Sequence, residues 1–233
     1  MSIAPRNTPP TEVLVVLPTY NERQNVERVV SAVRKLGHDV MIVDDSSPDG
    51  TGEIADRLAA SDAGVRVLHR PGKLGLGSAY KDAFRIGLED GSHRAQDLLP
   101  IVDAARTSGG LALGSRYIPG GSIEGWPLRR WLLSWGANVY CRLLLRVPTR
   151  DTTSGFRCYT KDLLAHIGLD QVRSQGYSFQ IEMVYRARRL GFKVVEVPIK
   201  FEDRVAGASK VSENEVRRAL LTVLRLSLGR WRR

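Results

Sequence analysis

The sequence predicts an α/β protein whose mostly parallel sheet is flanked by helices. Two apolar runs of strand length, residues 13–17 and 40–43, lie on either side of a helical stretch at residues 25–36. A strand, a helix and a second strand in this order form the repeating unit of a parallel sheet. Ligands bind such sheets at the carboxyl ends of the strands. The first candidates for a site are therefore the residues that follow the two runs: Pro18, Tyr20, Glu22, Asp44 and Asp45.

The pattern continues through a third strand and the helix after it. A turn sequence at residues 46–50 leads to a predicted helix over residues 51–60, and residues 65–69 form a short strand. Residues 70–77 form a basic, glycine-rich loop before a predicted helix over residues 78–89. Glycines in this place can let backbone N–H groups approach a phosphate, although a plain strand-to-helix connection explains them equally well. The loop lacks the Gly-Lys-Ser/Thr ending of a P-loop, which excludes an NTPase of that class.

One strand is missing from the expected alternation. The helix that ends near Glu89 is followed at once by Ser92 and His93, and another helix begins near Asp97. Two successive helices on a parallel sheet call for a strand between them. Either the two helices meet in a short turn, or a strand has been lost here.

The second half of the chain mixes short strands with two basic helices. Residues 111–115 are predicted as a strand and residues 118–125 as a glycine-rich loop. Residues 126–147 combine three tryptophans and several leucines with four arginines, which is typical of a helix in the membrane interface. A core helix with an arginine face is the alternative. Residues 213–233 form a second basic helix with apolar residues at helical spacing, and this helix is another candidate for binding anionic membrane.

A flexible loop near the end of the chain carries two cations. A polar loop at residues 151–157 first precedes two predicted helices and a strand at residues 192–198, whose proline marks an edge or an end. The loop at residues 201–210 then places Arg204 and Lys210 among small residues. Two cations on such a loop suit a lid that closes over phosphates.

The composition indicates an anionic partner. The 233 residues hold 35 Lys and Arg against 25 Asp and Glu, which gives a formal net charge of +10. Nucleic acid, anionic lipid or a phosphorylated substrate would each suit this charge. The chain has no helix-turn-helix, zinc-finger or RNP signature, and its arginines gather on the two apolar helices. Lipid is therefore favoured, and nucleic acid is not expected as a partner.

The cysteines and the first residues indicate where the protein acts. Cys141 and Cys158 form neither a disulfide framework nor a metal cluster and fit a reducing compartment. Residues 1–12 lack the apolar core of a signal peptide and are predicted to be a flexible leader. No run approaches the roughly 20 apolar residues of a membrane span. We therefore expect a cytoplasmic protein that is peripheral on the cytosolic face of a membrane.

Five motifs in this order resemble those of the polyprenol-phosphate mannose synthases, also called dolichol-phosphate mannosyltransferases, which belong to the family 2 glycosyltransferases. They are Pro-Thr-Tyr-Asn-Glu at 18–22, Val-Asp-Asp-Ser-Ser-Pro-Asp-Gly-Thr at 43–51, Gly-Ser-Arg-Tyr at 114–117, Thr-Ser-Gly-Phe-Arg at 153–157 and the loop at 201–210. Each motif alone is a weak signal. Together they are specific for the family, and the last loop favours its dolichol-phosphate branch.

The resemblance implies a GT-A fold over residues 13–210, with residues 126–147 as an interface segment and residues 211–233 as a basic C-terminal helix. It implies transfer of mannose from GDP-mannose to a polyprenyl phosphate, with inversion at the anomeric carbon and a divalent cation, Mg or Mn. Matching positions place five residues in the nucleotide pocket and three cations on the phosphates. The pocket residues are Pro18, Tyr20, Glu22, Val43 and Asp45, and the cations are Arg116, Arg204 and Lys210.

These residue types suit the implied chemistry. The acceptor is a phosphate monoester with a second pKa of about 6, so it is already an anion at neutral pH and needs no strong general base. The reaction instead needs cations that stabilise the leaving diphosphate and bring two anions together. A carboxylate such as Asp45 or Glu22 can hold nucleotide hydroxyl or N–H groups. The alternatives are a helix N-terminal charge for Glu22 and a strand-end turn residue for Asp45.

The chain departs from the family between Gly91 and Ser92. Family members carry there a strand ending in Asp-Ala-Asp, whose aspartates bind the metal, and both the strand and the motif are absent from this sequence. Three explanations stay open: a real deletion that leaves the protein inactive or unstable, a sequence that omits a segment, or another acid standing in. The candidate acids are Asp90, Asp97 and Asp103. We assign no metal ligand, and a catalytically inactive protein that binds a nucleotide or a partner is the alternative to an active transferase.

Overall fold

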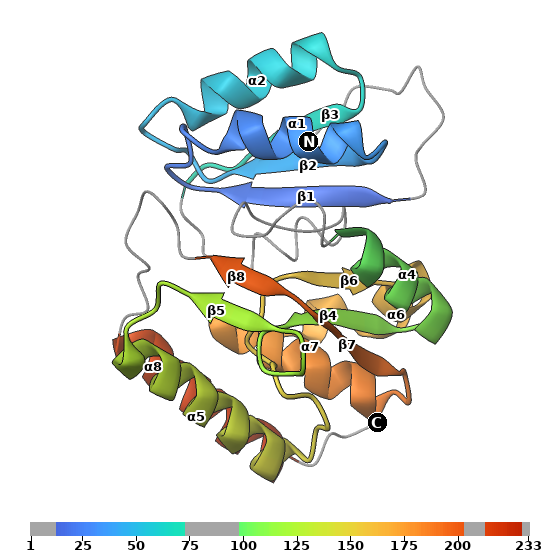
Figure 1. The fold of residues 1–233 in the computed structure, drawn as a ribbon, viewed down its shortest axis with the longest axis vertical. Helices are drawn as coiled ribbons and strands as arrows, with labels where there is room; N and C mark the ends of the chain where they lie inside the picture. Colours follow the sequence, from blue (N-terminus) through green and yellow to red (C-terminus); the bar gives the residue numbers. More distant parts are fainter. Residues whose placement is uncertain (1–12, 73–97, 203–212, 230–233) are drawn as a thin grey trace. The chain divides into compact units, whose positions relative to one another are not determined.

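The computed structural model describes residues 13–72, 98–202 and 213–229. The chain divides into two compact units, residues 1–91 and 92–233, and each is described by itself (Figure 1). The boundary between the units coincides with the junction at which we predict that a strand is missing. That junction lies outside the described residues, so the loss of a strand stays a prediction, as do the predicted domain limits.

Over residues 13–72, the first unit forms a three-stranded parallel sheet with two helices. Its strands run in the order β1-β2-β3, and every neighbouring pair is parallel. The pairing places Pro18 opposite Val43, and Asp44 opposite His69. The strands and helices predicted within residues 13–69 are thus confirmed, and the helix predicted over residues 78–89 lies outside the described residues. The confirmed elements are β1 (Leu14–Thr19), α1 (Val26–Lys35), β2 (Asp39–Asp44), α2 (Thr51–Ser61) and β3 (Val65–His69).

The middle strand of this sheet forms the centre of the unit's core. All six residues of β2 are buried, because β2 has a hydrogen-bonded neighbour on each edge. Helix α1 buries Val26, Val30 and Val33, which recur at helical spacing and so share one face. A strand buried in this way appears in the sequence as a continuous apolar run rather than an alternating one.

The second unit contains the remaining described elements (Figure 1). Its main sheet has the order β6-β4-β7, with β4 antiparallel to β6 and parallel to β7, and a separate parallel pair joins β5 to β8. The strands are β4 (Leu111–Ser115), β5 (Ser122–Glu124), β6 (Arg157–Tyr159), β7 (Val194–Pro198) and β8 (Lys200–Glu202). The helices are α4 (Leu98–Ser108), α5 (Leu128–Leu145), α6 (Lys161–His166), the short η2 (Leu169–Gln171), α7 (Tyr177–Arg189) and α8 (Glu213–Leu228).

Three short strands correct the sequence prediction. The predicted loop at residues 118–125 contains β5, the loop at residues 201–210 begins within β8, and the polar loop at residues 151–157 runs into β6. A three-residue strand is too short to show a period, and distant partners set its position. Gly121 illustrates this constraint, because a Cβ there would lie 2.6 Å from the Ser115 carbonyl oxygen.

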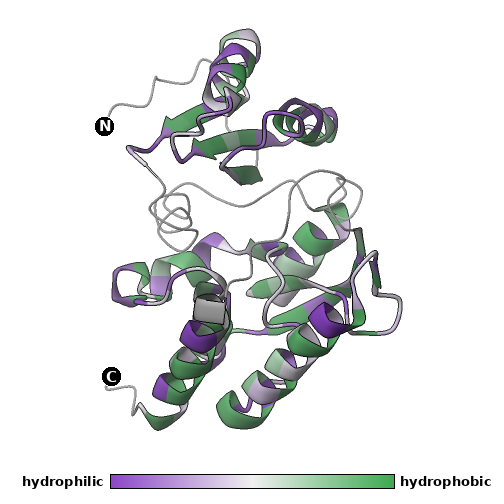
Figure 2. Ribbon diagram, turned by 90° about the vertical axis from the view of Figure 1, so that its left-hand side faces the viewer, coloured by the Kyte–Doolittle hydropathy of each residue, from purple (hydrophilic) through white to green (hydrophobic). Residues whose placement is uncertain are grey.

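Helices α5 and α8 pack against each other and expose apolar side chains. Only Asn138, Cys141 and Leu145 are buried on α5, so a core helix with an arginine face does not describe it. Figure 2 shows hydrophobic residues along these helices. The exposed large apolar residues of α5 are Leu128, Trp131, Leu132, Leu133, Trp135, Leu143 and Leu144, and those of α8 are Leu220, Leu221, Leu224 and Leu228. No helix in the described ranges is long and apolar enough to cross a membrane.

Candidate active site

The carboxyl ends of the three parallel strands in the first unit are joined by backbone hydrogen bonds. The Asp45 N–H donates to the Thr19 carbonyl (3.1 Å), and the Arg70 N–H donates to the Asp44 carbonyl (2.8 Å). Residues that follow different strands are therefore fixed side by side. The five residues predicted for the nucleotide pocket, Pro18, Tyr20, Glu22, Val43 and Asp45, all lie at this end of the sheet.

Two loops at this end are held together through the backbone of one and the side chains of the other. The N–H groups of Glu22 and Arg23 donate to Thr51 Oγ1 (3.0 Å) and to an Asp49 carboxylate oxygen (3.1 Å). Burial raises the pKa of Asp49, but hydrogen bonds from Thr51 and Arg23 outweigh it, and the net pKa is lowered. Glu22 also accepts a hydrogen bond from Asn25 Nδ2 (2.9 Å). The two loops thus form a fixed rim around the strand ends.

Asp45 forms a buried ion pair that the sequence did not predict. Arg70 donates from Nε and Nη2 to the two oxygens of Asp45, at 2.6 and 2.9 Å. The side chain of Arg70 is 2% exposed and that of Asp45 is 10% exposed. Arg70 directly follows β3, so strand order brings it beside Asp45 across 25 residues of sequence. Asp45 therefore not only follows β2 at the turn, as the alternative interpretation proposed, but also forms an ion pair with Arg70.

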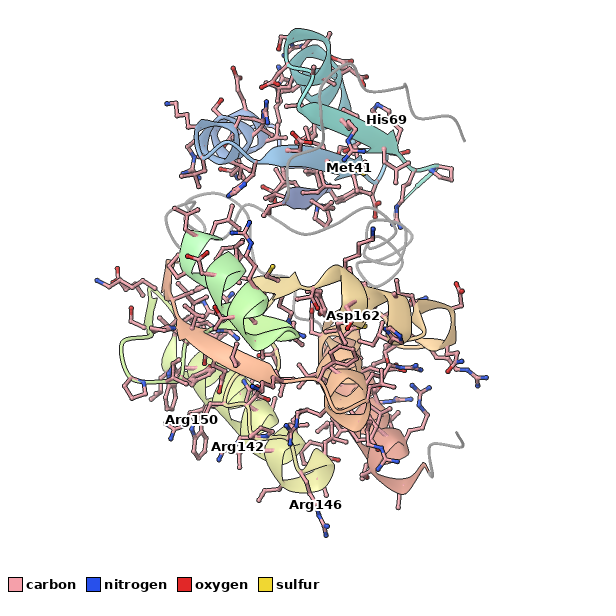
Figure 3. All side chains as sticks on the ribbon, turned by 90° about the vertical axis from the view of Figure 1, so that its right-hand side faces the viewer. Met41, His69, Arg142, Arg146, Arg150 and Asp162 are labelled. Atoms are coloured by element: carbon pink, nitrogen blue, oxygen red, sulfur yellow. The ribbon has the colours of Figure 1, made fainter. Side chains whose placement is uncertain are left out.

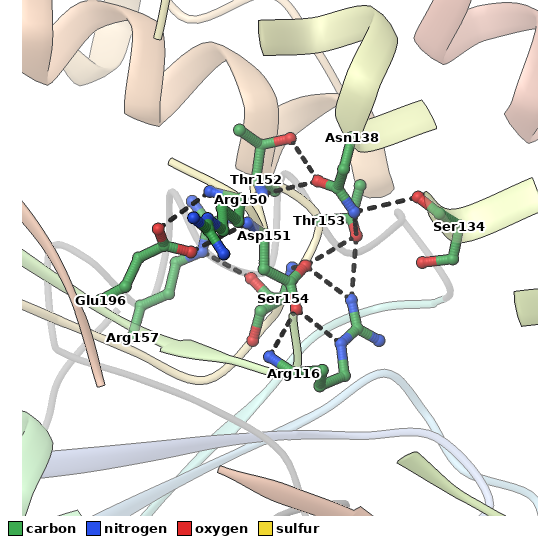
Figure 4. Close-up of polar contacts among 10 residues, drawn as sticks. All are labelled: Arg116, Ser134, Asn138, Arg150, Asp151, Thr152, Thr153, Ser154, Arg157 and Glu196. Atoms are coloured by element: carbon green, nitrogen blue, oxygen red, sulfur yellow. Dashed lines mark hydrogen bonds and ion pairs between the residues drawn. The ribbon is translucent and has the colours of Figure 1, made fainter. Parts of the chain in front are cut away.

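In the second unit, Arg116 is held by a fully buried carboxylate. Its Nε and Nη2 donate to the two oxygens of Asp151 at 2.7 and 2.8 Å, and its backbone N–H donates to Asp151 at 3.1 Å (Figure 4). The side chain of Asp151 is 0% exposed. Burial raises the pKa of Asp151, but the charge of Arg116 and its hydrogen bonds outweigh it, so the net pKa lies below its usual value. The guanidinium of Arg116 is therefore fixed in one orientation by an ionised partner.

Side chains from three elements hold the loop that carries Asp151. Asn138 of α5 accepts through Oδ1 from the N–H and the hydroxyl of Thr152, at 2.7 and 2.8 Å. Glu196 of β7 accepts the N–H groups of Arg150 and Asp151, each at 2.9 Å. Arg157 of β6 donates to the Thr152 carbonyl at 2.6 Å (Figure 4). These contacts order the loop before any ligand binds.

Thr153 connects the Arg116 pair to helix α5. Its hydroxyl accepts from Nη2 of Arg116 (2.9 Å) and lies 3.2 Å from Nδ2 of Asn138, which donates to it. Asn138 is 2% exposed and also donates to the Ser134 carbonyl within α5. Asp151, which orients Arg116, and helix α5, which exposes leucines to solvent, are therefore joined by hydrogen bonds through Thr153. Asp151 and Asn138 were not predicted as site residues, although Asp151 lies two residues before the motif at residues 153–157.

Aromatic rings surround the guanidinium of Arg116. Its central carbon lies 5.5 Å from the ring centroid of Tyr117, 5.2 Å from that of Trp126 and 5.6 Å from that of Phe201. Such contacts attract a cation to the ring faces. The guanidinium of Arg116 thus lies among three aromatic rings. This arrangement suits a ligand that has both an anionic and an apolar part. The other two predicted cations, Arg204 and Lys210, lie outside the described residues.

The described residues include no group of three His, Cys, Asp or Glu side chains that could hold a metal ion. Asp103, one of the three acids considered as a substitute, has a 73% exposed side chain on α4 and lies 3.7 Å from Arg106. The other two, Asp90 and Asp97, lie outside the described ranges. We therefore assign no residue of this chain as a ligand of a divalent cation.

Both cysteines are free thiols, with Cys141 buried and Cys158 partly buried. Burial raises the pKa of Cys141 and that of Cys158 to about 11 each. Since the thiolate is the reactive form, we expect both thiols to react with a thiol-specific reagent at neutral pH much more slowly than free cysteine. Labelling kinetics in native protein and in denaturant would check this, and labelling of either residue at the rate of free cysteine would contradict it.

Sequence comparison relates the chain to known proteins. Residues 14–88 match the model of the glycosyl transferase family 2. Over 234 aligned residues, or 94% of its length, the chain is 45% identical to the polyprenol monophosphomannose synthase of Mycolicibacterium smegmatis, and it covers 88% of that protein. The chain is a family 2 glycosyltransferase. This glycosyltransferase is also 43% identical over 233 residues to the undecaprenyl-phosphate mannosyltransferase of Micrococcus luteus, covering 94% of the chain and 96% of that protein.

Solved structures show the fold of this glycosyltransferase. A mannosyltransferase from Pyrobaculum calidifontis, solved in complex with GDP-Man and Mn2+, matches 97% of the chain and 73% of its own length with a TM-score of 0.56 at 14% identity. TarS 1-349 of S. aureus matches 93% of the chain and 71% of its own length with a TM-score of 0.53 at 15% identity. The predicted α/β fold is thus confirmed as GT-A-like.

Proposed function

We propose that this glycosyltransferase transfers mannose from GDP-mannose to a polyprenyl phosphate, with inversion at the anomeric carbon, at the cytosolic face of a membrane. The proposal rests on sequence identity. Over 94% of its length, the chain is 45% and 43% identical to two enzymes that are named for this type of reaction. The GDP-Man complex of the structurally similar mannosyltransferase supports the donor.

The described residues support a division of roles. The strand ends of the first unit, with Glu22 and the Asp45–Arg70 pair, hold the nucleotide through its hydroxyl and N–H groups. Arg116 in the second unit stabilises phosphate charge, because a cation fixed in advance acts without reorganisation during the reaction. Arg204 and Lys210 complete the set of phosphate cations. The acceptor phosphate, an anion at neutral pH, attacks without a general base.

A divalent cation is part of the proposal because the structurally similar mannosyltransferase was solved with Mn2+. Such a cation supplies charge neutralisation on the leaving diphosphate. The family's Asp-Ala-Asp motif is missing from the sequence between Gly91 and Ser92, and this departure favours a second candidate, an inactive relative that binds nucleotide without transferring sugar.

One experiment separates the two candidates. Transfer of labelled mannose from GDP-mannose to a polyprenyl phosphate is measured with Mn2+ present, and GDP-mannose binding is measured separately by calorimetry. We expect both transfer and binding. Binding without transfer would identify the inactive relative, and neither one, from folded protein, would overturn the nucleotide assignment itself.

The exposed surface of α5 and α8 supports binding to an anionic membrane. Arg142 and Arg146 lie at the C-terminal end of α5, and Arg150 is exposed after it (Figure 3). Apolar side chains next to arginines suit the boundary between acyl chains and anionic headgroups. The helices therefore bring the enzyme to its lipid acceptor.

We expect the triple change Leu132→Ser, Leu133→Ser, Leu143→Ser to weaken binding to anionic vesicles by about tenfold or more, since each leucine loses apolar contact with the acyl chains. Co-sedimentation with vesicles measures this. The matched control is Leu190→Ser, which alters a leucine of similar exposure, 42%, at the end of α7. Equal binding by the triple variant and the wild type would contradict the membrane assignment.

A further inference from the structure

We propose that Trp131 and Trp135, together with Tyr117, form the binding path for the first isoprene units of the acceptor, leading away from Arg116. This inference rests on the proposed function and deepens it, because it assigns a place to the apolar part of the substrate. The path lies wholly within the second unit.

The three rings form a continuous row. Trp131 and Trp135 are stacked with an interplanar angle of 6° and centroids 6.1 Å apart. Tyr117 meets Trp131 edge-on, with centroids 6.3 Å apart, and the Arg116 guanidinium lies 5.5 Å from the Tyr117 ring. The row thus begins at a cation and continues along α5 in apolar aromatic surface.

The row is open to a ligand at its outer part. Trp131 is 36% exposed and Trp135 is 47% exposed, whereas Tyr117 is half-buried. Solvent contact of two stacked indoles costs free energy, in proportion to the apolar area left in water. An apolar ligand that covers them removes that cost, and exposed aromatic surface of this kind marks sites of binding.

The order of groups along the row matches a polyprenyl phosphate. The guanidinium of Arg116 suits the phosphate, and a second cation, Arg130, lies with its guanidinium carbon 3.9 Å from the Trp126 ring centroid. Aromatic surface follows, which suits a hydrocarbon chain that has no hydrogen-bonding groups. An amphiphile with a charged head and an unsaturated chain therefore fits the row in one direction only.

The tryptophans lie on the side of α5 that carries Asn138, next to the exposed leucines. Trp131, Trp135 and Asn138 are spaced by four and three residues and so share one side of the helix. Asn138 is the residue that bonds the loop holding Asp151. Leu132 and Leu143 are eleven residues apart, about three turns, and Leu132 borders the tryptophan side because it lies three residues before Trp135. The acceptor chain on the tryptophans would therefore lie next to the leucines that we assign to the lipid.

The test uses a short, water-soluble isoprenyl phosphate in the absence of vesicles. Binding to the full chain is followed by intrinsic tryptophan fluorescence, and the KM for this acceptor is measured in the transfer assay. We expect Trp131→Ala and Trp135→Ala each to raise the dissociation constant and the KM for the isoprenyl phosphate by about tenfold, because each variant loses one large apolar contact. The KM for GDP-mannose should stay unchanged, and Trp131→Phe should recover most of the affinity. Leu190→Ala, at an exposed leucine outside the row, is the control.

Each outcome has one meaning. Unchanged acceptor affinity in both alanine variants, with transfer intact, overturns the path and leaves the proposed function standing. A loss seen only when the acceptor is embedded in vesicles also overturns the path, because the tryptophans are then bilayer anchors. If the wild type binds the isoprenyl phosphate through these tryptophans but transfers no mannose, the path stands and the proposed function fails.

Discussion

Replacing Asp151 with asparagine is expected to destabilise the protein by about 3–5 kcal/mol, because it removes the buried carboxylate charge that pairs with the guanidinium of Arg116. The side chain of Arg116 is only 7% exposed, and Asp151 accepts three hydrogen bonds from that residue. We also expect transfer to fall by about a hundredfold, since a misplaced Arg116 no longer meets the phosphate in the right geometry. Urea unfolding and initial transfer rates measure the two effects.

The matched control for this prediction is Asp162→Asn. Asp162 is a 68% exposed aspartate on α6 that lies 3.2 Å from His166 (Figure 3). An exposed pair contributes about 0–1 kcal/mol, so this variant should be close to the wild type in both stability and rate. Equal losses in the two variants would show that Asp151 has no special role.

The pH dependence of unfolding gives a second check on Asp151. Its pKa is lowered in the folded protein from the ordinary value of 3.8. A carboxyl group with a lowered pKa stabilises the fold fully above its unfolded pKa, and that stability is lost as the pH falls through the folded pKa. The difference in unfolding free energy between wild type and Asp151→Asn should therefore be constant at neutral pH and shrink below about pH 4.

A double variant separates orientation of Arg116 from stability. Replacing a buried ion pair with apolar residues of similar size is often neutral for stability or favourable. Arg116→Met with Asp151→Leu should therefore recover much of the stability lost in Asp151→Asn. Transfer should stay low, because the cation itself has gone. Recovery of both properties would mean that Arg116 takes no part in the reaction.

The Asp45–Arg70 and Arg116–Asp151 ion pairs show which features of the fold can be predicted from the sequence and which cannot. The apolar runs at residues 13–17 and 40–43 have the length and composition of buried strands, so the strands and the polar residues at their ends were predicted correctly. The partners of Asp45 and Arg116 were not, because they are 25 and 35 residues away and no local pattern marks them. Topology alone brings them together, and a single sequence does not reveal which arginine meets which aspartate.

The short strands illustrate the same limit at the level of secondary structure. Ser122 to Glu124 form β5 only because residues 200–202 lie beside them, and the pair is held by tertiary context. The exposed leucines of α5 were visible as a pattern, yet their position on the surface follows from how Asn138 and Cys141 turn the helix toward the core. The position of β5 and the orientation of α5 thus depend on tertiary contacts, which the hydrophobic periodicity of the sequence does not predict.

Asp45→Asn is the second change for which we expect a large effect. It removes the carboxylate charge that pairs with the guanidinium of Arg70, whose side chain is 2% exposed. The expected loss of stability is again about 3–5 kcal/mol. Because both residues lie at the strand ends assigned to the nucleotide, GDP-mannose binding should weaken by about tenfold or more, as two to three lost hydrogen bonds imply. Calorimetry with GDP-mannose and urea unfolding measure these effects.

The control lies in the same unit and involves the same residue type. Asp56 on α2 has a 61% exposed side chain and lies 2.8 Å from His69, so Asp56→Asn changes only a contact at the solvent-exposed surface. We expect it to bind GDP-mannose like the wild type. If Asp45→Asn also binds normally while losing stability, Asp45 is a structural residue and the nucleotide pocket must be sought elsewhere.

If Asp45→Asn loses GDP-mannose binding, the variant Arg70→Lys shows whether Asp45 contacts the nucleotide directly or only when Arg70 holds it in place. A lysine keeps the charge but cannot donate to both carboxylate oxygens at once. Retained affinity in Arg70→Lys would therefore mean that Asp45 itself contacts the nucleotide, whereas lost affinity would mean that it needs the arginine to hold it in place.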